Sequence, residues 1–300
     1  MIIYIGNYMS KHGITPTMCE LLVPMFKERY EVITSSDKRN VFLRMWDMMR
    51  TVHLNRKKAK VILIDCYSTL NFWYAYIIAW QARIYGIRYI PILHGGRYEA
   101  RLTNSPKATK TLFAKSFKNI SPSLFLVDVF KRFGFEAGHI NNFLPIKNYP
   151  YKERTTIRPR LFWVRQFIAN YNPPMALKTI VILKKKYPDA HLCMVGPANF
   201  PEYFEEIKKL VKELDIEENV TFTGRLTKEQ WTAKAADYDI FINTTFADNQ
   251  PLSVIEAMAL GLPQISTNAG GLPYLVRDGI DGIVVPMDDE NAMVGAVEKY

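Results

Sequence analysis

The sequence predicts an α/β protein made of two Rossmann-like domains, and three observations carry this prediction. Short apolar runs alternate with amphipathic segments of helical period along the chain, a pattern typical of parallel sheets covered by helices. The alternation stops between residues 142 and 159, where prolines and charges follow no period, and then begins again. The length of 300 residues also suits two domains.

The first domain is predicted to span residues 1–145. Its apolar runs predict strands at 1–6, 31–35, 60–65, 87–93, 119–121 and 137–141. Apolar residues at helical spacing predict helices at 15–29, 40–55, 70–85 and 122–133. A lysine-rich segment, 107–118, precedes the fifth strand.

Residues 146–159 are predicted to form a linker, and residues 160–300 the second domain. Its predicted strands are 160–165, 190–195, 220–223, 238–243 and 282–285. Its predicted helices are 175–186, 201–214, 227–235 and one that starts at residue 291. Because the sequence stops inside this last helix, we expect the natural chain to continue beyond Tyr300.

The stretch 243–275 is the most informative part of the chain and is predicted to form a loop, a helix, a strand and a second loop. Pro251 suits a helix start, because its missing N–H group would be unpaired there in any case. Gly261 and Pro263 end this helix. One face of this helix carries Leu252, Ile255, Met258 and Ala259.

Two carboxylates bracket the start of this helix, Asp248 in the loop and Glu256 inside the helix. A helix N-terminus offers free N–H groups and partial positive charge, which suit a phosphate. Carboxylates only accept hydrogen bonds, so the two acids suit hydroxyl groups. Phosphate and hydroxyl groups together indicate a sugar nucleotide as the ligand. The competing interpretation is an ordinary buried strand and helix with a stray acid.

The spacing of Asp248 and Glu256 resembles the acid–seven residues–acid motif of retaining glycosyltransferases of the family-4 type. The strings E-A-M-A-L-G-L-P and G-G-L-P also resemble that family, although its first acid is more often Glu than Asp. The resemblance implies the glycosyltransferase-B architecture, with two Rossmann-like domains whose parallel sheets face each other across a cleft. Ligands of such sheets bind at the carboxyl ends of the strands, so the cleft would hold the active site.

The resemblance also implies a role for individual residues. Arg165 would contact the donor diphosphate, to which a planar guanidinium is suited. Glu256 would bind the nucleoside ribose, and Asp248 the hydroxyls of the donor sugar. His94, at the carboxyl end of a predicted strand, would lie beside the reacting carbon, so that the catalytic set is His94, Asp248 and Glu256. The alternative for His94 is a hydrogen bond within its own loop.

Six further residues complete the donor-binding set that the resemblance implies. Gly13 closes a loop that would face the phosphates, and Arg225 lies in a loop expected near the nucleobase, although plain turns remain possible at both places. The other members are Asn249, Pro251, Leu252 and Ser253. Gly270 and Gly271 would permit close backbone approach to a ligand.

The chain departs from the family pattern at two places. The Lys-Gly pair expected about five residues after Arg165 is replaced by the segment N-Y-N-P-P at 170–174. A second cation is therefore missing from its usual place beside the phosphates. Tyr274 stands where the family often has Glu, so one sugar or phosphate contact is missing as well.

The expected function is retaining transfer of a sugar from a uridine or guanosine diphosphate donor to a hydroxyl of a glycan or lipid-linked acceptor. Surface polysaccharide synthesis is the expected setting, and no cofactor is expected. Asp237-Tyr238-Asp239 spells the D-x-D of metal-dependent glycosyltransferases, but it leads into a buried strand, so no metal is expected. The alternatives are a sugar-nucleotide epimerase of the same fold and a non-enzymatic basic binding module. The missing G-x-G-x-x-G fingerprint argues against a dinucleotide dehydrogenase.

Charge is distributed unevenly between the two halves. Residues 1–150 hold 22 Lys and Arg against 9 Asp and Glu, whereas residues 151–300 hold 17 against 20. The segment 107–118 sets Leu112, Phe113 and Phe117 among lysines, which fits either an anionic membrane surface or a solvated helix face with its phenylalanines in the core. No nucleic-acid motif is present, so specific nucleic-acid binding is not expected.

The expected location is the cytoplasm, with possible peripheral attachment to the inner membrane face. The N-terminal residues read as a first strand and not as a leader, and the longest uncharged run falls short of a membrane span. The three cysteines, Cys19, Cys66 and Cys193, are far apart and are interpreted as buried thiols.

Overall fold

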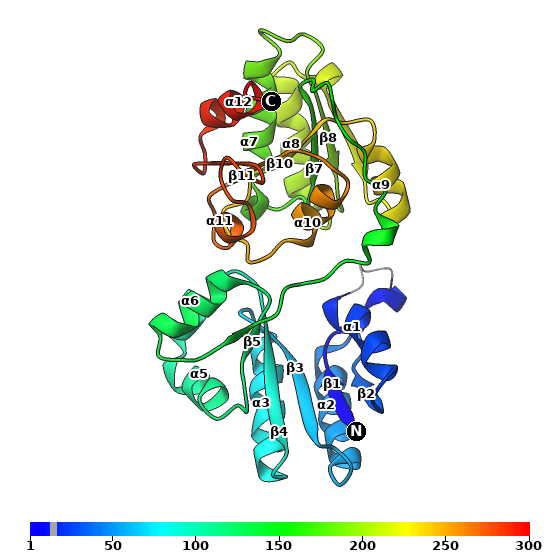
Figure 1. The fold of residues 1–300 in the computed structure, drawn as a ribbon, viewed down its shortest axis with the longest axis vertical. Helices are drawn as coiled ribbons and strands as arrows, with labels where there is room; N and C mark the ends of the chain where they lie inside the picture. The colour runs from blue at the N-terminus through cyan, green and yellow to red at the C-terminus, as the bar shows by residue number, and fades with distance from the viewer. Residues whose placement is uncertain (13–16) are drawn as a thin grey trace. The chain divides into compact units, whose positions relative to one another are not determined.

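The computed structural model describes residues 1–12 and 17–300. The chain forms two compact units, Met1–Asn142 and Phe143–Tyr300. Each unit contains a six-stranded sheet with helices packed against it (Figure 1). All the strand pairs are parallel, which confirms the predicted α/β class with two Rossmann-like domains.

The sheet of the first unit has the strand order β2-β1-β3-β4-β5-β6. Its strands are β1 (Ile2–Ile5), β2 (Val32–Ser35), β3 (Val61–Tyr67), β4 (Arg88–His94), β5 (Ile120–Ser121) and β6 (Gly138–His139). Its helices are α1 (Met18–Lys27), α2 (Val41–Asn55), α3 (Phe72–Ile84), α4 (Tyr98–Asn104), α5 (Pro106–Phe113) and α6 (Leu124–Arg132), with a 3-10 turn at Ser10–His12. The sequence did not predict α4, because its seven residues include only two buried side chains, too few to show a helical period.

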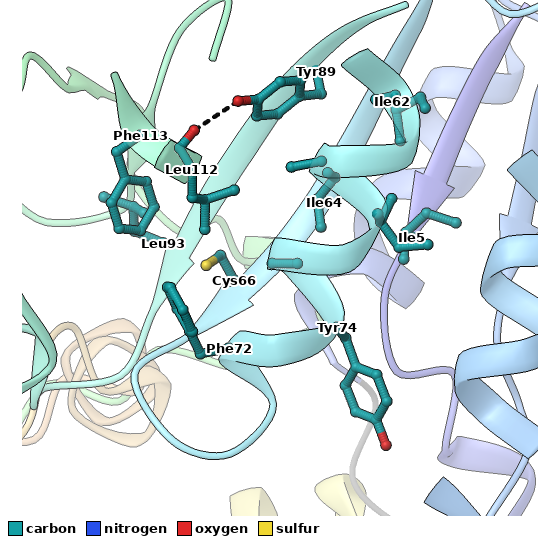
Figure 2. Packing of buried hydrophobic residues seen from close by; sticks show 14 of the residues in the cluster. Ile5, Ile62, Ile64, Cys66, Phe72, Tyr74, Tyr89, Leu93, Leu112 and Phe113 are labelled. Carbon is teal, nitrogen blue, oxygen red and sulfur yellow. Dashed lines mark hydrogen bonds between the residues drawn. The ribbon is translucent and has the colours of Figure 1, made fainter. Parts of the chain in front are cut away.

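Successive residues of the central strands face two different cores. Ile3 and Ile5 pack into the core shared with α2 and α3, whereas Tyr4, between them, belongs to a smaller core beneath α1. Figure 2 shows part of the larger core, in which the Tyr89 hydroxyl donates a hydrogen bond of 2.8 Å to the Leu112 carbonyl. This alternation is the period-two pattern expected of a strand with helices on both faces.

Helix α5 covers the first part of the lysine-rich segment 107–118, and two of the segment's three large apolar residues are in the core. Leu112 and Phe113 are 0% and 2% exposed. Phe117 is exposed and lies 4.8 Å from the guanidinium of Arg88. The structure therefore supports a solvated helix face for this segment, with its apolar side turned to the core. Within the described part of the chain, no helix is long and apolar enough to cross a membrane.

The sheet of the second unit has the strand order β12-β11-β10-β7-β8-β9. Its strands are β7 (Arg160–Val164), β8 (His191–Val195), β9 (Val220–Gly224), β10 (Ile240–Asn243), β11 (Gln264–Thr267) and β12 (Ile283–Val285). Its helices are α7 (Pro173–Leu183), α8 (Pro201–Glu213), α9 (Lys228–Ala235), α10 (Leu252–Ala259), α11 (Leu272–Leu275) and α12 (Glu290–Val297), with 3-10 turns at Ile146–Asn148, Ala169–Tyr171 and Glu217–Asn219. Because β7 pairs with β10, the residues that follow these two strands meet at one edge of the sheet.

The segment predicted as a linker is attached to the second unit. The Arg154 guanidinium donates hydrogen bonds to the carbonyls of Leu260 at 2.9 Å, Tyr238 at 2.9 Å and Ala235 at 3.1 Å. Tyr149 is buried in the core of this unit. These contacts explain why the boundary between the compact units falls after Asn142 and not around residues 146–159.

The three cysteines lie in three different cores. Cys66 is in the core shared with α2 and α3, Cys19 lies beneath α1, and Cys193 is in the second unit. All three are free and buried, as predicted. Burial raises the pKa of the Cys66 thiol to about 12.

Candidate functional site

The loop between β10 and α10 and the start of α10 carry most of the predicted site residues. Pro251 is the N-cap of α10, in agreement with the predicted helix start. The face that carries Leu252, Ile255, Met258 and Ala259 is half-exposed, and the buried positions are Ser253, Val254, Glu256 and Ala257. Since most of this short helix is apolar, its apolar period does not single out one face. Glu256 lies on the face that packs inward, together with Ser253, Val254 and Ala257.

Glu256 is held by two side chains that the sequence did not indicate. Its Oε1 accepts a hydrogen bond of 2.8 Å from the Tyr149 hydroxyl and forms an ion pair with the ammonium of Lys228. The Glu256 side chain is only 6% exposed. Burial, followed by the nearby Glu256 charge, raises the pKa of Tyr149, so this phenol stays a hydrogen-bond donor at neutral pH. Both bonds end on Oε1, and Oε2 remains the oxygen that can accept from a ligand hydroxyl.

No signal in the sequence pointed to these two partners. Tyr149 lies in the stretch interpreted as a linker, 107 residues from Glu256. Lys228 is the first residue of α9, and its ammonium lies 5.0 Å from the ring of Trp231. The only available hint was its position just after the Gly224–Leu226 loop, which was expected near the nucleobase.

Arg165 and Asp248 form an ion pair at the edge where β7 and β10 end. The Arg165 Nη2 lies 3.1 Å from the Asp248 Oδ2, and the two side chains are 10% and 19% exposed. Arg165 also donates from Nε and Nη2 to the Asn243 side-chain carbonyl, at 3.1 Å each. Its guanidinium lies 5.1 Å from the ring of Tyr171. The structure thus brings together Arg165, the residue predicted to bind the diphosphate, and Asp248, the residue predicted to bind the sugar. The Arg165 guanidinium has contacts on three sides.

Gly270 and Gly271 fix the position of the Asp248 loop. The Gly271 N–H donates a hydrogen bond of 3.0 Å to the Asp248 carbonyl. A Cβ atom on Gly271 would lie 1.8 Å from the Asn249 carbonyl oxygen, and one on Gly270 would lie 2.2 Å from the Asp248 carbonyl oxygen. The close approach predicted for these glycines is therefore to the backbone of residues 248–249.

Two buried polar atoms at the start of α10 have no hydrogen-bond partner among the described residues. They are the Asn249 Oδ1 and the Ser253 Oγ, on residues that are 4% and 8% exposed. An unpaired buried polar atom costs about 1–3 kcal/mol, so such atoms call for an explanation. The Ser253 hydroxyl can donate to an anionic ligand group beside the free N–H groups of the helix start, whereas the Asn249 Oδ1 is an acceptor and needs a ligand hydroxyl or N–H group. Both residues belong to the predicted donor-binding set.

His94 lies in the first unit, where it pairs with a buried carboxylate. The Asp65 Oδ1 lies 2.9 Å from the His94 Nε2 and accepts a hydrogen bond of 3.1 Å from the Tyr4 hydroxyl. The Asp65 side chain is 1% exposed. Since a carboxylate only accepts, the Nε2 atom carries the hydrogen of this bond, and the imidazole orientation is set by Asp65 and by the ring of Tyr67, 5.1 Å away.

Asp65 was missed at the sequence level, although a signal was present. It is the only charged residue in the strand V-I-L-I-D-C-Y, where an unpaired carboxylate would be costly. Its other oxygen faces Gly6: a Cβ atom at that position would lie 2.7 Å from the Asp65 Oδ2. The glycine of the first loop is therefore required by the packing of this carboxylate.

The remaining predicted residues are more dispersed. Arg225 is exposed in the loop after β9, and Gly13 lies outside the described residues. The acids of the D-x-D string each have a cation: Asp237 pairs with Lys234 at 3.2 Å, and Asp239 pairs with Arg158 at 3.0 Å. No cluster of three metal-ligating side chains occurs in the part of the chain that the structure describes.

Known glycosyltransferases resemble parts of this chain in sequence. Residues 158–300 match the family described as glycosyl transferases group 1. The chain is 28% identical over 147 residues to a GDP-mannose-dependent alpha-(1-6)-phosphatidylinositol monomannoside mannosyltransferase of Mycolicibacterium smegmatis. It is 34% identical over 123 residues to an uncharacterized glycosyltransferase of Haemophilus influenzae. These matches span 47% and 41% of this chain and only 38% and 33% of the two relatives.

Solved structures resemble the chain over almost its entire length. A complex of HepE from Anabaena with UDP and glucose has a TM-score of 0.74 at 16% identity, covering 99% of this chain and 89% of that one. Sucrose-phosphate synthase from Thermosynechococcus elongatus has a TM-score of 0.77 at 16% identity, covering 99% and 88%. Residues 158–300 thus match the glycosyl transferases group 1, and the chain has the glycosyltransferase-B fold.

Proposed function

We propose that this protein is a retaining glycosyltransferase that moves a sugar from a nucleotide-diphosphate donor to a hydroxyl group of a glycan or lipid-linked acceptor. The observation that carries the proposal is the grouping of Arg165, Asp248 and Glu256 around one helix start in the second unit. Related structures containing UDP and glucose support a nucleotide-sugar ligand for this fold.

The second unit supplies groups for each part of such a donor. Arg165 presents a planar cation to the diphosphate, and the N–H groups at the start of α10 add partial positive charge. Glu256 accepts hydrogen bonds from ribose hydroxyls through Oε2. Asp248 accepts from the hydroxyls of the sugar. When the donor binds, the Arg165–Asp248 ion pair is replaced in part by contacts of each group with the ligand, so the charges are already oriented before the donor arrives.

The transfer itself needs stabilisation of charge more than a protein nucleophile. The bond from the sugar carbon to the diphosphate oxygen breaks, and the acceptor oxygen bonds to the same face of that carbon. The acceptor proton passes to the departing diphosphate, whose negative charge Arg165 stabilises. His94, fixed by Asp65, is the group of the first unit assigned to the sugar near the reacting carbon.

Lys228 is assigned a supporting role in donor binding. The chain lacks the lysine expected near residue 170, and Lys228 is the cation paired with Glu256. It balances the buried charge of Glu256 and sets the direction of its second oxygen. It does not replace a phosphate ligand in this proposal, so the diphosphate depends on Arg165 and the α10 N–H groups.

The proposed reaction uses no metal and no cofactor. Both acids of the D-x-D string are occupied by cations, and the leaving diphosphate has Arg165 and a helix start. We therefore expect full transfer activity in the presence of a chelator. Activity lost with EDTA and restored by magnesium or manganese would contradict this part of the proposal.

The proposed setting is the cytoplasmic side of the inner membrane, where a lipid-linked acceptor of a surface polysaccharide would be available. Relatives named as acting on phosphatidylinositol mannoside and in colanic acid biosynthesis support this choice of acceptor class. The excess of basic residues in the first half of the chain agrees with an anionic surface as partner.

A donor panel tests the proposed function directly. The protein is incubated with UDP- and GDP-sugars, with and without lipid-linked acceptors, and nucleotide release and thermal shift are measured. The expected result is a shift in Tm with one donor class and acceptor-dependent release, with the configuration at the sugar carbon retained by NMR. A new epimer of the sugar formed without acceptor would favour an epimerase. Donor binding would be contradicted if no nucleotide sugar shifted Tm and if the variant Arg165→Ala behaved like the unchanged protein.

A further inference from the structure

The helices α2 and α3 present large apolar side chains on their outer surface. Six of these side chains are between 42% and 83% exposed. We call them the α2–α3 outer face: Phe42, Leu43, Trp46, Trp73, Trp80 and Ile84. Single exposed apolar residues are ordinary, but neighbouring groups of this size mark interaction sites.

These six residues belong to one surface. Both helices contribute to the same core, over the same face of the sheet. They also lie side by side, since the Gln81 amide donates a hydrogen bond of 2.9 Å to the Met49 carbonyl and the Tyr74 hydroxyl one of 3.3 Å to the Val41 carbonyl. The buried positions of α2 and α3 point to the sheet, so the exposed positions form the outside of this helical layer.

The surroundings of the α2–α3 outer face are strongly basic. Residues 38–88 contain ten Lys and Arg and two acidic residues, and one residue of each kind, Arg44 and Asp65, is buried. The Arg50 guanidinium lies 5.6 Å from the ring of Trp46. Lys57 and Lys58 are exposed just beyond the end of α2. The surface is therefore both apolar and cationic.

We propose that the α2–α3 outer face binds an anionic lipid bilayer. Tryptophan and phenylalanine side chains insert at the level of the lipid headgroups, and the cations around them lie against the lipid phosphates. The proposal deepens the proposed function, on which it rests for a membrane-bound acceptor, and it moves the contact away from the lysine-rich helix α5, whose apolar side is in the core.

Charge decides between a bilayer and the other possible occupants. Two copies of this chain joined through the outer face would bring their basic residues together, which disfavours a dimer. A nucleic acid would satisfy the cations and stack on the aromatic rings, but it would leave Leu43 and Ile84 against a polar backbone. An anionic bilayer matches the apolar side chains and the charge together.

The position of the face within the first unit also suits a membrane-bound acceptor. Phe42, Trp46 and Trp73 lie in the first two turns of α2 and α3. In a parallel sheet covered by helices, these turns follow the carboxyl ends of the strands, the edge at which His94 ends β4. A bilayer bound to the outer face is therefore close to the edge of the sheet assigned to the sugar.

Vesicle binding with the full chain and no nucleotide sugar tests the proposal. The vesicles contain either phosphatidylcholine alone or phosphatidylcholine with one third phosphatidylglycerol. Binding is followed by flotation and by tryptophan fluorescence, since Trp46, Trp73 and Trp80 are exposed while Trp163 and Trp231 are buried in the second unit. The expected result is flotation and a blue shift with anionic vesicles, both lost in high salt, and neither with neutral vesicles.

Two sets of variants locate the contact. The double variant Trp46→Gln with Trp73→Gln is expected to weaken vesicle binding by about tenfold or more, because it removes inserted apolar surface. The changes Lys57→Ala and Lys58→Ala are each expected to weaken it by about fivefold. The matched control removes two lysines of α5, in Lys107→Ala with Lys110→Ala, and is expected to change binding less than twofold.

Several outcomes would overturn the proposal. If the α5 control weakened vesicle binding as much as the Lys57 and Lys58 changes do, only the overall charge of the protein would matter for binding. A dimer that dissociates in the Trp46→Gln variant would assign the face to a second copy, and single-stranded RNA that competes in place of vesicles would assign it to nucleic acid. The donor-induced thermal shift is measured in every variant. It reports on the second unit, so failure of donor binding is distinguished from failure of membrane binding.

Discussion

Replacing Glu256 by glutamine removes the charge from the buried carboxylate of α10 and keeps its shape. In the folded protein the Glu256 Oε1 accepts from the Tyr149 hydroxyl at 2.8 Å and pairs with Lys228. A glutamine can still accept from Tyr149 through its carbonyl oxygen, but it cannot form the ion pair. Because the Lys228 side chain is 36% exposed, its ammonium can turn to water. The expected loss in free energy of unfolding is therefore only about 1 kcal/mol, which lowers Tm by about 2–4 °C.

The expected effect on the donor is larger than the effect on folding. A hydrogen bond from a ribose hydroxyl to a carboxylate contributes about 1.5–3 kcal/mol, and a neutral amide recovers only part of this. We expect kcat/KM for the donor to fall by about tenfold to a hundredfold. Because the ribose does not change during transfer, most of the loss should appear as a higher KM.

Thermal unfolding, donor titration by calorimetry and steady-state kinetics measure these effects together. The matched control is Tyr149→Phe, which removes the hydroxyl, keeps the carboxylate charge and should weaken donor binding only a few-fold. Donor affinity unchanged in Glu256→Gln would refute the ribose assignment. A loss of donor affinity that the fraction of unfolded protein explains by itself would refute the ribose assignment as well.

Three further predictions concern the other groups of the candidate site. Asp248→Asn frees Arg165 from its ion pair, so the affinity for the free nucleoside diphosphate should stay the same or rise while sugar transfer falls at least a hundredfold; parallel losses in both assays would contradict separate roles for the two residues. Asp65→Asn removes the carboxylate that orients His94, so kcat should fall by about tenfold to a hundredfold with an unchanged Kd for the donor, and an unaltered kcat would reduce Asp65 to a packing residue. Gly271→Ala places a Cβ atom 1.8 Å from a backbone oxygen and should lower Tm by more than about 5 °C, whereas Gly295→Ala, with nothing within 4 Å of its Cβ atom, should leave Tm unchanged or raise it.

The sequence was sufficient for the fold class because the apolar runs of both sheets are regular. Each strand from β1 to β4 is built on an apolar run, and the same holds for β7 and β8. The short helix α4 was not predicted, because two buried residues do not define a helical period. The attachment of the predicted linker segment to the second unit could not be predicted, because Arg154 contacts main-chain carbonyls far along the sequence and such contacts have no sequence pattern.

The candidate site was predictable where a motif fixes the residues along the chain. Asp248, Glu256 and Arg165 were found from their place in ordered strings of residues. Their partners were not, since Tyr149 and Lys228 reach Glu256 only through the tertiary fold. The buried face of α10 could not be predicted for the same reason: the choice between two apolar faces depends on what a carboxylate meets in the core.

The separate burial of the three cysteines makes the thiols local reporters of unfolding. A thiol reagent reacts only when its cysteine is exposed, and burial raises the pKa of Cys66 to about 12, which suppresses reaction from the closed state further. Cys66 reports on the layer formed by α2 and α3, Cys19 on the layer beneath α1, and Cys193 on the second unit. Labelling followed by mass spectrometry therefore gives three opening rates from one unmodified chain, and their order shows which layer separates first.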